Sequence, residues 1–210
     1  MIWQLLSWFF LLMLLGWVTF PLAYHLFRKL PGRGFTLSRI LGLLLWGFFF
    51  WLLSWLGILQ NNKGGILLAL FLVMLLSIWA GWKRWREIWG WVKDHWRLAL
   101  AAESVFLLSF TFMTLVRASN PDATGTEKPM ELAFINAILN SQTFPPHDPW
   151  LSGYSISYYH FGYILVGMLA KLTSTSGGVA FNLALISTFS LSALGAYGVV
   201  YNLLVSFGKT

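Results

Sequence analysis

Long apolar runs with almost no charge decide what this chain can fold into. The run Ile40–Leu59 contains no Asp, Glu, Lys or Arg, and about 20 such residues form a helix that crosses the hydrocarbon core of a bilayer. Only 10% of the residues in the whole chain are charged, compared with about 25% in soluble domains. We therefore expect an all-α integral membrane protein and exclude a soluble fold.

The apolar runs predict about six transmembrane helices. They are Ile2–Phe27, Ile40–Leu59, Ile66–Trp82, Leu98–Val116, Tyr158–Leu172 and a run within Val179–Phe207. The first run lacks a basic flank and a small-residue cleavage site, so we interpret it as a retained helix and not as a signal peptide. The sequence has no cysteine, which excludes disulfides and thiolate metal sites.

A tryptophan-rich segment follows the third run. Its aromatic and apolar residues recur at helical spacing and form one stripe: Trp82, Trp85, Trp89, Val92 and Trp96. The charged residues of the segment lie off that stripe. This pattern predicts a helix lying in the headgroup region of the membrane. We divide the chain into an N-terminal three-span region, residues 1–97, which includes this helix, and a second module, residues 98–210.

The distribution of Lys and Arg predicts the orientation. Two connections are strongly basic: they carry Arg28, Lys29, Arg33 and Arg39, and Lys83, Arg84, Arg86, Lys93 and Arg97. The positive-inside rule puts these in the cytoplasm, and the N-terminus and the long loop 117–157 outside it. The chain is thus expected in the cell membrane as a multi-pass protein with membrane lipids as partners. The net charge of +7 then reflects orientation, and no nucleic-acid partner is expected.

One acidic residue lies inside a predicted span. Glu103 is about a turn and a half into the run Leu98–Val116. Ionisable groups in spans are costly and often functional. The alternative is a structural role, in which Glu103 reaches the membrane surface or pairs with Arg97.

The loop 117–157 is the largest stretch that is not apolar. It carries Asp122, Glu127, Glu131 and Asp148. Pro129 suits the first position of a helix, and the apolar spacing after it predicts an amphipathic helix near the membrane plane over residues 129–141.

Carboxylates at the outer membrane surface suit sugar transfer from a lipid-linked donor. Asp122, Glu127 and Asp148 are candidates either to deprotonate an acceptor hydroxyl or to hold a divalent cation, and His147 is a candidate base or ligand. Lys128 or Arg117 is suited to neutralise a phosphate. The rings of Tyr154, Tyr158, Tyr159 and His160 fit either stacking on a sugar or an interfacial belt. The alternative for the acids is simple solvation.

Five segments carry a resemblance to a known family. They read RASNPD (117–122), GTEKPME (125–131), NAIL (136–139), FPPHDPWLSG (144–153) and YYHFG (158–162). In this order they resemble the YYY family of uncharacterised multi-pass membrane proteins of bacteria and archaea, named for a tyrosine triplet. The resemblance covers about residues 98–205. It departs from the family at His160, which stands in place of the third tyrosine.

The YYY family is in turn similar to class-C glycosyltransferases. That similarity implies a polyprenyl-phosphate sugar as donor, Asp122 and Glu127 as catalytic residues, and a divalent cation, Mg²⁺ or Mn²⁺, held by the same two carboxylates. The residue types of the loop add the candidate substrate contacts Lys128, Arg117, Asp148, His147, Tyr158, Tyr159 and His160.

Two further expectations follow from the resemblance and from the loop. Asp122 and Glu127 should approach one another, with Asp148 or His160 across the same cavity. Because such enzymes are longer, the chain is expected to be an N-terminal part, with the remaining part as a separate chain. Two alternatives stay open: a non-catalytic scaffold that binds lipid or glycan, and a transporter component.

Overall fold

The computed structural model describes residues 2–208, and all the regular elements in that range are helices. They are α1 (Ile2–Leu26), η1 (Phe35–Leu37), α2 (Ser38–Trp55), α3 (Lys63–Gly81), α4 (Trp85–Asp94), α5 (Trp96–Ser119), α6 (Lys128–Asn140), α7 (Phe161–Leu172) and α8 (Gly177–Phe207). This confirms the expected all-α membrane architecture, including the short helix in the long loop.

Five helices are long and apolar enough to cross a membrane. They are α1, η1 with α2, α3, α5 and α8. The sixth predicted span, Tyr158–Leu172, is the 12-residue helix α7, which is only about 18 Å long against a hydrocarbon core of about 30 Å. The count of about six agrees with five long helices and one short apolar helix, but α7 lacks the length of a span.

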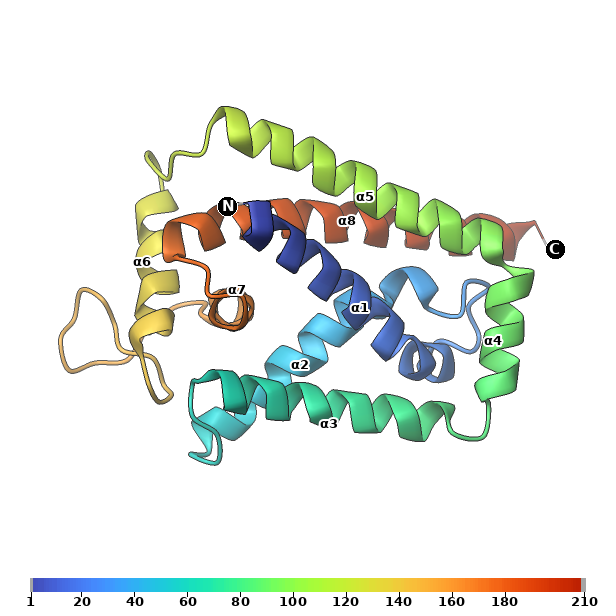
Figure 1. Ribbon diagram of the computed structural model, residues 1–210, viewed down its shortest axis with the longest axis horizontal. Helices are drawn as coiled ribbons and strands as arrows, with labels where there is room; N and C mark the ends of the chain where they lie inside the picture. The colour runs from blue at the N-terminus through green and yellow to red at the C-terminus, as the bar shows by residue number, and fades with distance from the viewer. Residues whose placement is uncertain (1, 209–210) are drawn as a thin grey trace.

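The helices form one elongated bundle with a short helix across each end. In Figure 1, α3, α5 and α8 run along the long axis, α1 and α2 cross between them, and α7 is seen end-on. Helix α4 lies across one end and α6 across the other. We call these the α4 end and the α6 end.

Because α7 does not cross the bundle, both of its ends lie at the α6 end. Thr173, just after α7, accepts a hydrogen bond of 3.0 Å from the indole of Trp8 in the first turns of α1. Ser174 accepts one of 2.9 Å from Lys63 at the start of α3. Helix α8 therefore starts beside α6 and runs to the α4 end, which is opposite to the direction that six full spans predict.

The bundle core is built around α1. Its side chains Trp8, Leu12, Leu15 and Phe20 are almost fully buried, since α1 is surrounded by α2, α3 and α8. In a soluble protein, burial of one such side chain stabilises the folded state by about 1.5–3 kcal/mol. Within a bilayer the surrounding lipid is also apolar, so close packing between helices provides the stabilisation instead.

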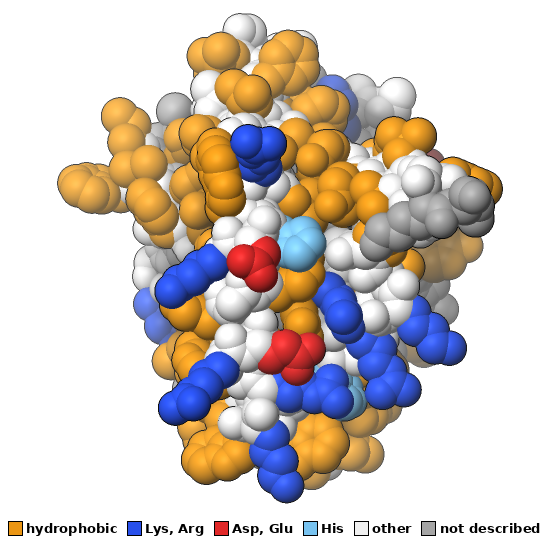
Figure 2. Space-filling view, turned by 90° about the vertical axis from the view of Figure 1, so that its right-hand side faces the viewer, with side chains coloured by type: hydrophobic (Ala, Val, Ile, Leu, Met, Phe, Trp, Pro, Cys, Tyr) orange, Lys and Arg blue, Asp and Glu red, His pale blue; other side chains and the backbone are white. Residues whose placement is uncertain are grey.

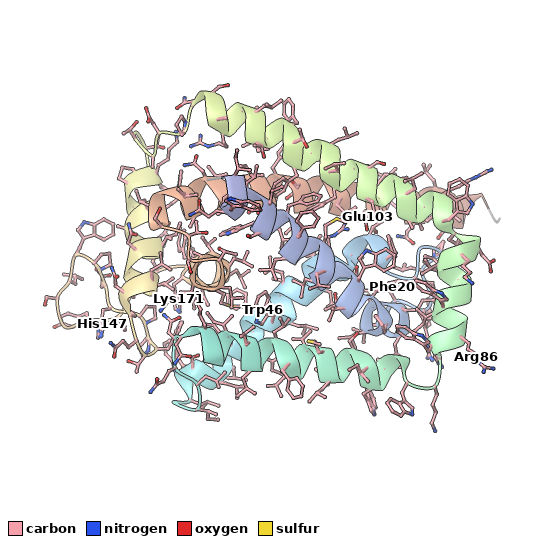
Figure 3. The ribbon with its side chains drawn as sticks, in the orientation of Figure 1. Phe20, Trp46, Arg86, Glu103, His147 and Lys171 are labelled. Atoms are coloured by element: carbon pink, nitrogen blue, oxygen red, sulfur yellow. The ribbon has the colours of Figure 1, made fainter. Side chains whose placement is uncertain are left out.

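A buried ion pair joins α2 to α5. The Arg39 guanidinium donates to the carboxylate of Glu103 and lies 4.5 Å from the centre of the Phe106 ring. Glu103 faces the bundle (Figure 3). Glu103 thus pairs with a basic residue, as the structural alternative expects, but the partner is Arg39 and not Arg97, which lies instead over the ring of Trp96. Moving either charge away from water costs free energy, and the attraction between the two opposite charges offsets that cost.

The remaining charges divide between the two ends. Among residues 2–208, the α4 end carries Glu87, Asp94 and eight basic residues: Arg28, Lys29, Arg33, Lys83, Arg84, Arg86, Lys93 and Arg97. The α6 end carries four acidic and four basic residues: Asp122, Glu127, Glu131 and Asp148, and Lys63, Arg117, Lys128 and Lys171. The charge asymmetry read from the sequence is thus an asymmetry between the two ends of the bundle.

Candidate functional site

Helix α6 forms where it was predicted because Pro129 lies in its first turn, where a missing N–H costs nothing. Its buried residues are Phe134, Ile135 and Ile138, which pack against α7 and α8. The helix lies across the ends of the spans (Figure 1), which confirms the expected amphipathic helix near the membrane plane.

Asn61, in the α2–α3 connection, holds the C-terminus of α6. Its buried side chain donates hydrogen bonds of 2.7 Å to the carbonyls of Ile138 and Ser141, which a helix end otherwise leaves without partners. Its own carbonyl accepts from Lys171 of α7, and burial lowers the pKa of Lys171. Figure 3 shows Lys171 on α7 beside α6. Sequence reasoning missed this connection.

The first residues of the loop are tied to α8. Arg117, in the last turn of α5, donates 2.8 Å to the side-chain oxygen of Asn182, whose amide nitrogen donates 3.1 Å to the carbonyl of Pro121. Arg117 also donates 3.4 Å to the carbonyl of Asp122. Asp122 is therefore presented at a fixed place where α5 ends and α8 begins.

The segment between Asp122 and α6 is a tight turn. Gly125 and Thr126 have φ of 77° and 53°; this left-handed region is free for glycine and uncommon for threonine. The turn leads directly to Glu127, the residue before α6.

The three candidate acids differ in how their carboxylates are used. Asp148 accepts hydrogen bonds of 2.8 and 2.9 Å from the backbone N–H groups of Trp150 and Leu151, so it stabilises its own turn. Asp122 and Glu127 are exposed, and within residues 2–208 neither carboxylate has a hydrogen-bond or ion-pair partner. These two carboxylates are available to a ligand, whereas Asp148 is engaged.

An apolar groove of about 280 Å³ reaches Arg117 from between α1, α5 and α8. Pro121 and Asn182 complete its polar end, and its walls are aliphatic: Ile2, Leu5, Val179, Leu183 and Ile186. A hydrocarbon-lined groove with a guanidinium at one end suits an amphipathic ligand with an anionic head. We call it the Arg117 groove.

A second groove, of about 450 Å³, is aromatic. It runs between α2 and the start of α7 and is lined by Phe48, Trp51, Tyr158, Tyr159, His160, Phe161 and Gly162. The ring of His160 stacks on Trp55 at 6.2 Å between centroids, and Tyr158 stacks on Phe134 of α6 at 5.7 Å. The indole nitrogen of Trp51 is buried with no partner within the described chain. The tyrosine motif thus forms a surface that can stack on a ring and donate hydrogen bonds.

Tyr163, which sequence reasoning also missed, links this surface to the acids of α6. Burial raises the pKa of the Tyr163 hydroxyl, and the charges of Glu131, Tyr158 and Glu127 raise it further. Its ring lies 5.5 Å from that of Phe134. A tyrosine three residues after His160, one turn along a helix, was the available signal.

The other predicted residues lie apart from these groups. Lys128 is half-buried at the start of α6, and the side chains of His147 and Tyr154 are exposed. Figure 3 shows His147 on the loop beyond α6. In the part of the chain that the structure describes, no three His, Asp or Glu side chains form a group that would hold a metal ion. A cation here would need further ligands besides Asp122 and Glu127.

Together, the five long apolar helices and the charge-divided ends define an integral membrane protein with a structured loop at one membrane face. The chain belongs to the uncharacterized membrane protein family DUF2298, whose model matches residues 45–210. That match begins within α2, so it includes part of the region 1–97 as well as all of 98–210. Comparison with curated proteins and with solved structures found no match.

Proposed function

We propose that the protein is a glycosyltransferase-like membrane protein that uses a polyprenyl-phosphate sugar at the extracytoplasmic face. The observation that carries the proposal is the position of Arg117. Its guanidinium lines an apolar groove between three helices and also donates to the backbone of Asp122. A lipid tail, a phosphate and a free carboxylate would then meet at one point.

The orientation supports the same face for this chemistry. Eight basic residues gather at the α4 end, whereas the α6 end is balanced in charge. By the positive-inside rule, the α4 end faces the cytoplasm and the α6 end faces the outside. Loop 117–157, α6 and the start of α8 would then all be extracytoplasmic.

In the proposed reaction, the hydroxyl oxygen of an acceptor attacks the anomeric carbon of the donor sugar. The bond from that carbon to the phosphate oxygen breaks, and polyprenyl phosphate leaves with the electron pair. Asp122 or Glu127 takes the hydroxyl proton, a general-base role that contributes typically 10²–10⁴-fold. Arg117 binds the phosphate, and Tyr158, Tyr159 and His160 offer rings to a sugar.

A divalent cation fits this site only in part. Mg²⁺ is often held by one or two carboxylates together with substrate phosphate oxygens, and Asp122 and Glu127 are exposed carboxylates without partners among the described residues. When bound, such a cation would neutralise charge on the phosphate. Asp148 is unsuited as a further ligand because its carboxylate oxygen already accepts two backbone hydrogen bonds.

The test is sugar transfer from a radiolabelled polyprenyl-phosphate sugar by the reconstituted protein. Asp122→Asn and Glu127→Gln should each lower the rate about 100-fold, in line with loss of a general base. Asp94→Asn makes the same change at an exposed residue of the α4 end and should leave the rate unchanged. If the parent transfers no sugar, or if both folded variants match it, the catalytic proposal fails and the scaffold alternative replaces it.

A further inference from the structure

The α4 end contains a polar pocket that the proposed function does not use. It has a volume of about 480 Å³ and lies between the α1–α2 connection, the end of α4 and the end of α8. Its lining combines three cations with a histidine and few apolar groups: Arg28, Lys29, Leu30, Pro31, Arg33, Trp91, His95 and Ser206. Among residues 2–208, no carboxylate lines it. From this pocket we infer a binding site for a phosphate-bearing anion.

The cations of this pocket have no anionic partner in the described part of the chain. The one ion pair between residues 2 and 208 is Arg39–Glu103, which lies inside the bundle. Of the two acids at this end, Glu87 accepts a hydrogen bond of 2.9 Å from Tyr24, and Asp94 is exposed on α4. Figure 2 looks onto this end and shows Lys and Arg side chains gathered around a few acidic ones. The unpaired positive charge attracts an anion.

The backbone that carries the cations is held in place. The N–H of Gly32 donates 2.8 Å to the side chain of Asn202 in α8, and Asn202 is itself buried and bonded to the carbonyl of Gly198. Successive turns follow, with Arg33 N bonded to Leu30 O at 3.0 Å. The pocket is therefore formed by a segment of fixed conformation. A mobile basic loop would be enough to set the orientation of the protein in the membrane, but it would not form such a pocket.

Arg33 adds an independent observation. Its φ is +48°, a left-handed conformation that few residues other than glycine adopt and that costs about 1–3 kcal/mol. The guanidinium lies 5.1 Å from the centre of the Tyr24 ring of α1, so its position is fixed by a contact within the protein. Glycine would relieve the backbone, so an arginine at this position points to a role for its charge.

The level of the pocket favours a lipid headgroup as the source of the phosphate. The indoles at the same end of the bundle are exposed: Trp82 by 76%, Trp85 by 61%, Trp89 by 50% and Trp96 by 56%. Exposed tryptophans at the end of a transmembrane bundle mark the headgroup level, and basic pockets between helices at the cytoplasmic face bind anionic headgroups. A soluble phosphate ester offers the same chemistry, so the test separates the two.

The probes are phosphatidic acid, phosphatidylcholine with the same acyl chains, and glycerol 3-phosphate. Native mass spectrometry of the detergent-solubilised full chain measures retention of each lipid, and glycerol 3-phosphate is added as competitor. We expect phosphatidic acid to bind at least about tenfold more tightly than phosphatidylcholine, because each nearby cation contributes about fivefold. Displacement by millimolar glycerol 3-phosphate assigns the site to soluble phosphates, and its absence assigns it to lipid; both support an anion site.

Two matched triple variants test whether the pocket itself binds. R28Q/K29Q/R33Q removes three cations that line it, and K83Q/R84Q/R86Q removes three at the same end that do not. The first should lower phosphatidic acid binding at least about tenfold and the second less than about twofold, since its charges lie outside the pocket. Equal losses in both variants, or no preference of the parent for phosphatidic acid, would overturn the inference.

Arg33→Gly guards against misfolding of the triple variant. It removes one cation while glycine accepts the positive φ, so thermal stability should be kept. Phosphatidic acid binding should fall about threefold to fivefold. A stable Arg33→Gly protein that binds as tightly as the parent would contradict the role assigned to Arg33.

Discussion

At the residue scale, Asn61 shows why the candidate site could be predicted only in part. The acids, cations and rings of the loop were predicted because they stand together in the sequence. The support from Asn61 was not, since its partners Ile138 and Ser141 are 77 and 80 residues away, and no local spacing reports such a contact. For the same reason, the sequence could not distinguish the engaged carboxylate of Asp148 from the free ones of Asp122 and Glu127.

Asn61→Ala should destabilise the protein. Loss of the side chain leaves two carbonyls at the buried end of α6 without donors, which costs about 1–3 kcal/mol. Thermal unfolding of the purified protein in detergent measures the effect as a lower Tm. Asn140→Ala is the matched control, because Asn140 is an exposed amide in the last turn of the same helix. Equal Tm values for the two variants would show that Asn61 does not hold α6.

At the element scale, prediction succeeded where the signal was local and failed where it was not. Helix α6 was predicted from Pro129 and the apolar spacing that follows it. The span over Tyr158–Leu172 was predicted from composition, which does not record where a helix begins. Residues Tyr158–His160 are not helical, and hydrogen bonds of Lys171 and Thr173 hold the far end of α7 at the same membrane face.

The contact of α7 with α2 depends on Gly47. A methyl group there would lie 1.9 Å from Cδ2 at the end of the Leu165 side chain, which must shift to make room; overpacking of this kind costs up to about 1–3 kcal/mol. Gly47→Ala should therefore lower Tm and disturb the aromatic groove, which α2 and α7 share. Leu165→Ala removes the clashing atom. The loss of unfolding free energy in the double variant should therefore be smaller, by at least about 1 kcal/mol, than the sum of the losses in the two single variants. Strict additivity would rule out this packing.

At the scale of the whole molecule, the sequence offers a prediction of orientation that awaits its test, because the positive-inside rule needs only charge counts in short connections. The course of α8 could not, because it depends on whether α7 crosses the membrane. With six full spans, the α7–α8 connection would be cytoplasmic and the end of α8 would be outside. With α7 confined to the α6 end, the α7–α8 connection would be outside and the end of α8 would be cytoplasmic. The predicted side of Asp122 is the same in both cases.

Cysteine labelling in intact cells tests this topology most directly, and the proposed site depends on it. The chain has no native cysteine, so Ser119→Cys, Ser174→Cys and Ser206→Cys each report one exposed position. An impermeant thiol reagent should label the variants at 119 and 174, and it should label the variant at 206 only after the cells are opened. Labelling at 206 with protection at 174 would mean that α7 crosses the membrane. Protection at 119 would place Asp122 in the cytoplasm and contradict transfer at the outer face.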